Sequence, residues 1–172
     1  MTVAPDTKDW TWVLLRPCPE CGYVADDVPR EQIGARLLAA AEALVASLDR
    51  SDASVRPSPE VWSPVEYCCH VRDACRVFAL RLHRMLTEDD PAFANWDQDA
   101  TAAEGEYDRQ EPAVVARQLL AEVRTLAGAW DAVPAEAWDR RGSRSDESVF
   151  TVLSLGRYLV HDLVHHVHDV AR

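Results

Sequence analysis

The sequence lacks three features that would place it in other classes of protein. It has no apolar run near the roughly 20 residues that a membrane-spanning helix needs. It has no excess of positive charge: the formal net charge is -11, and an acidic surface repels nucleic acids and anionic membranes. Residues 1–12 lack the basic start and apolar stretch of a signal peptide. We therefore expect a cytoplasmic protein that acts on a small molecule, with neither a nucleic-acid nor a membrane partner.

Two further absences concern strands and disulfides. No segment alternates apolar and polar residues in the pattern that predicts a β-strand. The five cysteines are an odd number, which fits free thiols or metal ligands better than a disulfide framework. What the chain does have is apolar residues at helical spacing. They lie in residues 29–50, 63–86, 111–133 and 148–172. We predict one all-α domain, an up-down four-helix bundle.

Local signals mark the ends of these helices and the connections between them. Ser63, followed by Pro64 and Glu66, has the pattern of a capping box. Residues 1–28 are rich in proline and polar side chains, and we predict that they form an irregular leader ahead of a bundle of residues 29–172. The tryptophans of this leader are candidate contacts for a homodimer. The acidic connection from Thr87 to Glu111 is long for a compact domain, and we expect it to border a pocket.

Histidines are concentrated in the last predicted helix, where residues 161–168 hold four of the six in the chain. At about 100° per residue, His161 and His165 lie one turn apart on one face, like the paired histidines of zinc-protease helices. We predict His70 as a third ligand, because bundles build metal sites from facing helices. Three neutral imidazoles leave coordination positions open, as in catalytic sites. Zinc is our first choice of divalent ion, with nickel, iron and manganese as alternatives.

The other histidines receive plainer interpretations. We interpret His83, His166 and His168 as ordinary surface or core residues; for His168 the alternative is that it extends the site or lines its mouth. Asp162 adjoins His161 but lies about 100° round the helix, so we do not expect it to reach the same ion.

Three charged residues near these histidines have two interpretations each. Arg157 lies one turn before His161, where it would bind a substrate carboxylate or pair with an acidic side chain. Glu66 and Asp73 flank His70 within about a turn each, where a carboxylate would orient an imidazole or be solvated.

A separate signal lies in the leader, where Cys18 and Cys21 form a Cys-x-x-Cys pair followed by Gly22. This shape is typical of a zinc knuckle or of a redox pair. One pair supplies only half of a structural zinc site, and the plain alternative is a turn whose cysteines pack beneath the bundle. The sequence leaves all three interpretations open.

The helices and histidines together resemble the DinB-like superfamily of metal-dependent four-helix bundles. Trp62-Ser63-Pro64-x-Glu66-x-x-x-His70 is similar to the second-helix segment of that family, and His161-x-x-x-His165 is similar to its last-helix pair. The resemblance covers residues 29–172 and implies that His70, His161 and His165 hold the metal. One branch contains thiol S-transferases, some of them mycothiol-dependent, which implies an ion that ionises a low-molecular-weight thiol for attack on an electrophile. Cys18 and Cys21 are not part of this family pattern.

We therefore predict a metal-dependent enzyme whose first candidate reaction is transfer of a mycothiol-like thiol to an electrophilic small molecule. Arg157 and Glu66 are our candidates for catalytic roles, and the residues that bind the thiol are not identified. Thiol-dependent isomerisation, or hydrolysis by metal hydroxide, is the alternative on the same three histidines. A non-enzymatic metal- or redox-responsive protein using Cys18 and Cys21 is the alternative from a different class.

Overall fold

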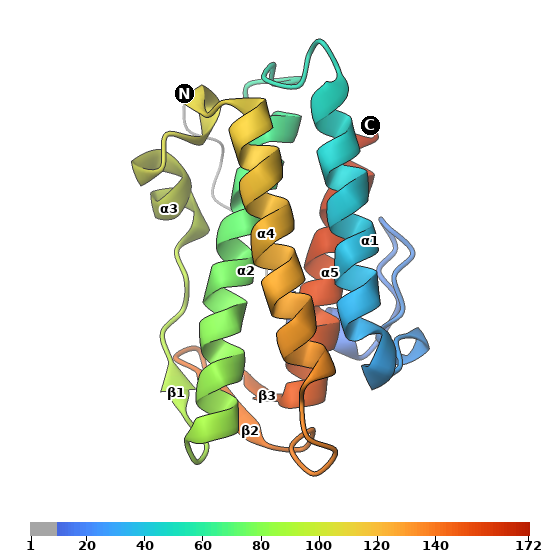
Figure 1. Ribbon diagram of the computed structural model, residues 1–172, viewed down its shortest axis with the longest axis vertical. Helices are drawn as coiled ribbons and strands as arrows, with labels where there is room; N and C mark the ends of the chain where they lie inside the picture. Colours follow the sequence, from blue (N-terminus) through green and yellow to red (C-terminus); the bar gives the residue numbers. More distant parts are fainter. Residues whose placement is uncertain (1–9) are drawn as a thin grey trace.

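Four long helices form the protein, and the computed structural model describes them within residues 10–172 (Figure 1). They are α1 (Ile33–Ala46), α2 (Pro64–Thr87), α4 (Pro112–Asp131) and α5 (Val152–Val170). Helices α1 and α2 each pack against both α4 and α5, so the four helices form a ring. The predicted all-α four-helix bundle is therefore present. Residues 1–9, which belong to the predicted leader, lie outside the described residues.

The helices do not simply alternate in direction. Arg72 of α2 donates to Gln118 of α4, and Arg76 one turn later donates to Glu122, so these two helices run parallel. This order departs from the alternation of an up-down bundle. The reason is the connection of residues 88–111, which carries the chain back to the end of the bundle where α2 begins (Figure 1). That connection contains β1 (Ala92–Phe93), α3 (Gln98–Glu104) and a short 3₁₀ turn, Tyr107–Arg109.

The two helices that carry the histidines begin at capping boxes. In α2, the Ser63 hydroxyl accepts from the Glu66 N–H, and the Ser63 N–H donates to the Glu66 carboxylate, as predicted. In α5, Thr151 and Ser154 make the equivalent pair of bonds. Helix α5 begins later than predicted because residues 149–151 belong to a strand.

A small sheet closes one end of the bundle, and the expectation of no strands is wrong on this point. Strand β2 (Arg141–Arg144) pairs with β1 in parallel and with β3 (Val149–Thr151) in antiparallel fashion. These strands are too short to show an alternating pattern in the sequence. Their effect is to fix the two connections at the end of the bundle where α2 stops and α5 starts.

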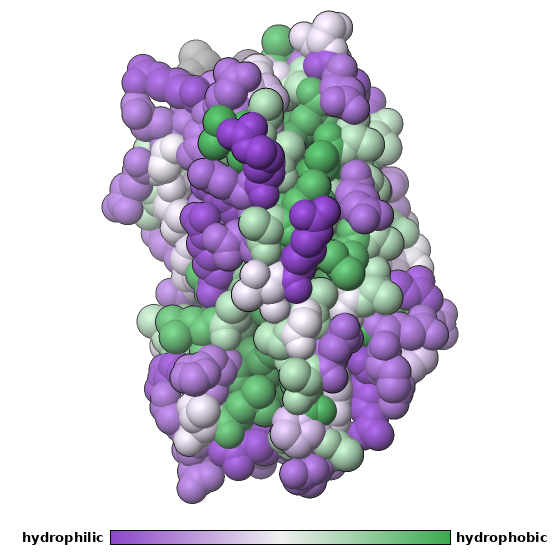
Figure 2. All heavy atoms as spheres, in the orientation of Figure 1, coloured by the Kyte–Doolittle hydropathy of each residue, from purple (hydrophilic) through white to green (hydrophobic). Residues whose placement is uncertain are grey.

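The interior is filled by side chains from all four long helices, and their burial supplies much of the stability of the fold. Fully buried examples are Leu37, Leu44, Leu82, Leu119, Leu126, Trp130, Leu155 and Leu159. Figure 2 shows hydrophobic side chains gathered in the seam between α4 and α1, bordered by hydrophilic ones. No helix within residues 10–172 has the length and apolar character needed to cross a membrane.

The described part of the leader lies along α5. It consists of turns that include two 3₁₀ segments, Thr11–Leu14 and Ala25–Asp27, and both contact α5. A third 3₁₀ turn, Arg30–Gln32, leads into α1, and a fourth, Ser47–Asp49, follows it. Val13 and Cys18 of the leader are buried. The leader therefore shields one face of the histidine-bearing helix.

Candidate functional site

Helix α5 presents two chemically distinct faces, offset by one residue. His161 and His165 occupy one face, and Asp162 and His166 occupy the next, about 100° round the helix. The first face meets the leader and the second faces α2. The structure accordingly forms two groups of potential metal ligands on this one helix.

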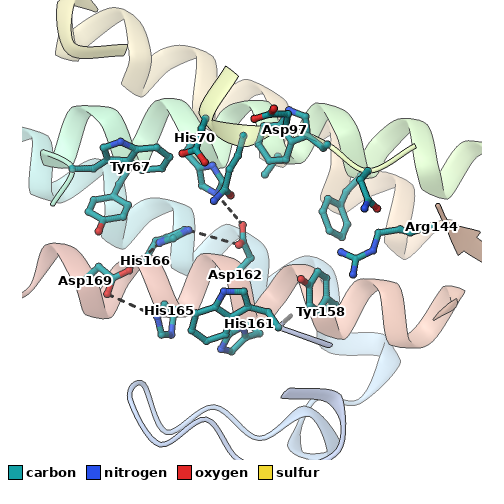
Figure 3. Close-up of a pocket in the computed structure, with 18 of the residues that line it drawn as sticks. Tyr67, His70, Asp97, Arg144, Tyr158, His161, Asp162, His165, His166 and Asp169 are labelled. Atoms are coloured by element: carbon teal, nitrogen blue, oxygen red, sulfur yellow. Dashed lines mark hydrogen bonds and ion pairs between the residues drawn. The ribbon is translucent and has the colours of Figure 1, made fainter. Parts of the chain in front are cut away.

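The first group, here called the cavity group, consists of His70, Asp162 and His166. In Figure 3, His70 on α2 and His166 on α5 point toward Asp162. The His70 Nε2 and Asp162 Oδ2 atoms lie 3.6 Å apart, as do His166 Nε2 and Asp162 Oδ1. Both distances exceed that of a hydrogen bond. Two atoms that bind one tetrahedral zinc at about 2.0–2.1 Å lie about 3.3 Å apart, so this spacing suits shared ligation.

The protonation states of Asp162 and His166 suit metal binding in the cavity group. Burial alone would raise the pKa of Asp162, but His70, His166 and His161 lower it well below its ordinary value, so the carboxylate is ionised. His166 Nδ1 lies 3.0 Å from the Asp169 carboxylate, which can only accept, so Nδ1 carries the proton and Nε2 is directed at Asp162. Both ring nitrogens of His70 are buried without a hydrogen-bond partner.

A cavity of about 520 Å³ opens beside this group. Trp62 and Trp96 form aromatic walls, and the Trp96 ring stacks on His70 with centroids 5.2 Å apart. Residues 95–99 of the long connection also line the cavity, in agreement with the prediction that this connection borders a pocket.

Two arginines, Arg81 and Arg144, line the cavity away from the histidines. Arg144 pairs with Asp146 at 2.9 Å. Arg81 is buried and donates to the Ala94 carbonyl, but it forms no ion pair within residues 10–172. Burial and the nearby Arg144 lower the pKa of Arg81 to about 10, which still leaves it charged at neutral pH. An arginine in this setting suits an anionic group of a bound molecule.

The second group, here called the leader group, consists of Cys18, Cys21, His161 and His165. The Cys18 Sγ and His165 Nδ1 atoms lie 3.7 Å apart. Burial lowers the pKa of His161 to about 4 and also lowers that of His165, so both imidazoles are neutral at pH 7. Burial raises the pKa of the Cys21 thiol to about 11, which does not suit a reactive thiolate.

The structure thus divides the three predicted metal ligands between the groups. His161 and His165 join the cysteines, whereas His70 joins Asp162 and His166. His166, which the sequence suggested was an ordinary residue, has its ring against His70 with centroids 4.8 Å apart and joins a group of potential ligands. The signal for both groups was present in the sequence: two i, i+4 pairs, offset by one residue, occupy adjacent helix faces.

Arg157 and Glu66, our candidates for catalytic roles, both lie outside the lining of the cavity. Arg157 donates to the Val28 carbonyl at 3.0 Å and pairs with Asp26 at 2.9 Å, so it holds the leader. Glu66 accepts from Ser63 and Arg56. Burial alone would raise the pKa of Glu66, but these bonds outweigh it and lower the pKa.

The flanking acid Asp73 is likewise engaged with partners other than His70. It pairs with Arg72 and Arg76 and accepts a hydrogen bond from the Tyr107 hydroxyl at 2.6 Å. It therefore does not orient the His70 ring.

The fold is similar to that of YfiT from Bacillus subtilis, described as "a probable metal-dependent hydrolase with an unusual four-helix bundle topology". The two structures match with a TM-score of 0.73 over 83% of this chain and 84% of that one. Their sequences are 17% identical, so the likeness establishes the fold alone. A search among curated proteins finds no match.

The sequence itself matches a family model, that of the DinB superfamily, over residues 35–170. The match takes in nearly all of the four long helices, including His70 and the α5 residues of both groups, and leaves out Cys18 and Cys21. Because it spans well over half of the sequence, it confirms the resemblance seen in the sequence. The chain belongs to the DinB superfamily.

Proposed function

We propose that this protein is a metal-dependent enzyme that acts on a small molecule in the cavity beside α2 and α5. The observation that carries the proposal is the cavity group itself. His70, Asp162 and His166 converge from two helices, with donor atoms within 4.8 Å of one another, at the wall of a cavity large enough for a small molecule. The all-histidine set of His70, His161 and His165 is the alternative assignment of the metal ligands.

The residues fit a divalent ion on three counts. The buried nitrogens of His70 have no other partner, and a polar atom left unpaired in the interior is costly. Asp162 brings a negative charge, and the Asp169 contact aims His166 Nε2 at the same point. Two imidazoles and one carboxylate suit zinc, iron or manganese and leave positions open on the cavity side. An ion bound there would act as a Lewis acid, lowering the pKa of a thiol or a water beside it.

The remaining lining supplies binding and orientation. Trp62 and Trp96 offer flat apolar walls against which a small substrate would pack. Arg81, a buried cation without a carboxylate partner among the described residues, would bind an anionic group of the substrate at the other end of the cavity. We therefore expect an electrophile that also carries a carboxylate or a similar anion.

Thiol transfer is the reaction to test first. In it, the sulfur of a low-molecular-weight thiol bonds to the electrophilic carbon, and the leaving group departs with the bonding electrons and takes up the thiol proton. Hydrolysis is the second candidate, and the fold shared with YfiT, a probable metal-dependent hydrolase, favours it. In that reaction water takes the place of the thiol. Both reactions need the same bound ion and differ only in the nucleophile.

The test combines metal analysis with product analysis on the full chain. The purified protein, loaded with zinc, iron(II) or manganese(II), is incubated with a panel of anionic electrophiles, with and without mycothiol or a simpler thiol. Thiol adducts formed only with protein and metal would support transfer, and hydrolysis products formed without thiol would support the second candidate. Absence of turnover with every metal and every electrophile would count against the proposal.

Variants identify which residues hold the ion. His166→Ala and Asp162→Asn are expected to lose the metal of the cavity and the activity, while His83→Ala, an exposed histidine of α2, keeps both. Should His166→Ala retain full metal and turnover while His161→Ala loses them, the all-histidine set would replace the cavity group.

A further inference from the structure

We propose that Cys18, Cys21, His161 and His165 form a second metal site, a closed Cys₂His₂ centre that takes zinc and fastens the leader to α5. This site is separate from the metal-dependent activity proposed above. It would also assign to a structural role two of the histidines that the sequence suggests for catalysis.

The leader turn is shaped to present both thiols on one side. The Gly22 N–H donates to the Cys18 carbonyl at 2.9 Å, and the Cys18 N–H donates to the Tyr23 carbonyl at 2.9 Å. These bonds reverse the chain within one turn. The reversal requires a positive φ of 74° at Gly22, a conformation that glycine adopts without strain. The turn thus brings Cys18 and Cys21 together against α5.

The distances suit tetrahedral zinc. All four donor atoms lie within 4.8 Å of one another. For zinc at about 2.3 Å from sulfur and about 2.0–2.1 Å from nitrogen, tetrahedral angles place the two ligand atoms about 3.6 Å apart. The Cys18 Sγ to His165 Nδ1 distance is 3.7 Å. Two sulfur and two nitrogen donors in this arrangement favour zinc over harder ions.

The surroundings of the two imidazoles support the same assignment. His161 Nε2 is buried and has no hydrogen-bond partner, which a metal bond would remedy. With His165 Nδ1 directed at the cysteine, its Nε2 lies 3.8 Å from the Glu20 carboxylate and 3.9 Å from that of Asp169. Carboxylates behind the second ring nitrogen orient metal-bound histidines in proteins.

The leader group differs from the cavity group in its number of protein ligands, four against three, although His161 and His165 also line the cavity. Cys18, His161 and His165 are buried, and the Trp10 and Tyr23 rings pack on the two imidazoles. Four protein ligands fill a tetrahedral ion and leave no position for a substrate, as in structural sites. Binding would release the two thiol protons to solvent, and the two thiolates would neutralise the charge of the ion.

The site would also shape the cavity. Trp10 contacts both histidines and lines the cavity on the side of α5. An ion in the leader group would hold the segment that carries this wall. Its loss is expected to loosen substrate binding indirectly, while the residues of the cavity group stay in place.

Cobalt(II) provides the test, because thiolate ligands give it a charge-transfer band in the ultraviolet and tetrahedral coordination gives it strong visible bands. The reduced full chain is stripped with a chelator and titrated with cobalt(II) and then zinc(II). We expect about two ions per chain, one for each group, and one of them should show thiolate bands that zinc abolishes.

Three variants make the result specific. Cys18→Ser/Cys21→Ser should lose the thiolate bands and about one of the two ions. His70→Ala/His166→Ala should lose the other ion and keep the bands, so failure of this proposal can be told apart from failure of the proposed function. Cys69→Ala, which removes a buried thiol of α2 outside both groups, should keep both ions.

A second measurement does not depend on the folding of any variant. In zinc-loaded wild type, Cys18 and Cys21 should resist alkylation and become reactive after chelation, as mapped by mass spectrometry. The proposal would be overturned by folded, reduced, cobalt-loaded wild type without thiolate bands, or by bands that survive replacement of both leader cysteines.

Discussion

The cavity group and the leader group are built from the same element and differ in what faces them. Each uses an i, i+4 pair of α5, Asp162 with His166 in one and His161 with His165 in the other. The first pair meets one histidine of α2 and a cavity, while the second meets two cysteines on a turn. Three protein ligands leave a coordination position open, which suits a catalytic ion, and four ligands fill a tetrahedral ion, which suits a structural one.

This contrast accounts for three of the four histidines in residues 161–168, and His168 belongs to neither group. A helix places residues i and i+4 on one face and shifts the face by about 100° with each step along the chain. If both proposals hold, the two overlapping pairs would serve two neighbouring sites without sharing a ligand. The His165 and His166 ring centroids lie 6.1 Å apart, so the two groups are adjacent. The comparison predicts separable effects: loss of turnover from one group and loss of stability from the other.

The largest effect should follow from His70→Ala. This change removes the α2 ligand of the cavity group, and we expect kcat/KM to fall by about a thousandfold, since a catalytic ion contributes several kcal/mol. The melting temperature of this variant should not fall below that of chelator-treated wild type. The variant keeps the ion of the leader group, whereas the chelator removes both ions. Steady-state kinetics and a thermal melt on the same samples measure both quantities.

The control for this prediction is His83→Ala on the same helix, which should leave both quantities unchanged because His83 is exposed and in neither group. If His70→Ala retained its activity, the assignment of the catalytic ion to the cavity group would be wrong.

The next effect is on stability and belongs to the leader group. Free zinc at about a thousandfold above its Kd stabilises a folded protein by about 4 kcal/mol. Adding a chelator should therefore lower the melting temperature of His70→Ala/His166→Ala, in which only the leader group can bind. The same chelator should have little effect once Cys18→Ser/Cys21→Ser is added to that background. If the chelator lowered the melting temperature equally in the two backgrounds, the leader group would have no structural role.

A smaller effect is expected at the anionic end of the cavity. Arg81→Met keeps an apolar side chain of similar length and removes the buried charge, so we expect KM for an anionic substrate to rise about tenfold. The KM of a neutral analogue should not change. Stability should not fall, because a buried cation without an ionic partner is costly to desolvate. Arg84→Met, on the same helix and outside the cavity lining, is the matched control.

Much of the fold could be predicted from the sequence, because the signals for it are local. The Ser63–Glu66 capping box and the apolar stripes depend on residues a few positions apart, and both predicted the helices well. The strand pairing of β1 with β2 joins residues 92–93 to 143–144, and no local pattern reports it. The parallel course of α2 and α4 likewise depends on where a long connection ends.

The candidate site shows the same limit more sharply. His70, His161 and His165 were recognisable as potential ligands from residue type and spacing. Their partners were not, because Cys18 reaches His165 only after the leader folds back across 147 positions of sequence. Arg157 had two interpretations, binding of a substrate carboxylate or pairing with an acidic side chain, and the same fold-back supplies Asp26 as the acidic partner. Contacts between residues far apart in the sequence therefore decide which side chains surround each histidine.

The smallest effect tests a region that serves neither site. Burial alone would raise the pKa of Asp73, but bonds from Arg72 and Tyr107 lower it. Its pKa in the folded protein thus lies below the unfolded value of about 3.9. Its contribution to stability is therefore present at neutral pH and is lost as the pH falls below about 4, through the folded pKa. Asp73→Asn should cost about 1 kcal/mol at pH 7, and this difference from wild type should vanish in acid.

Chemical denaturation of both proteins across this pH range measures that difference, and metal release at low pH cancels because the two share both metal groups. Asp52→Asn, at an exposed ion pair with Arg50, should give no resolvable change at any pH. A cost for Asp73→Asn that persisted below the folded pKa would show that Asp73 stabilises the helix pair by hydrogen bonding alone. A cost that disappeared on chelation at pH 7 would instead link this hydrogen-bond network to the metal groups, and would contradict the independence of Asp73 from both sites.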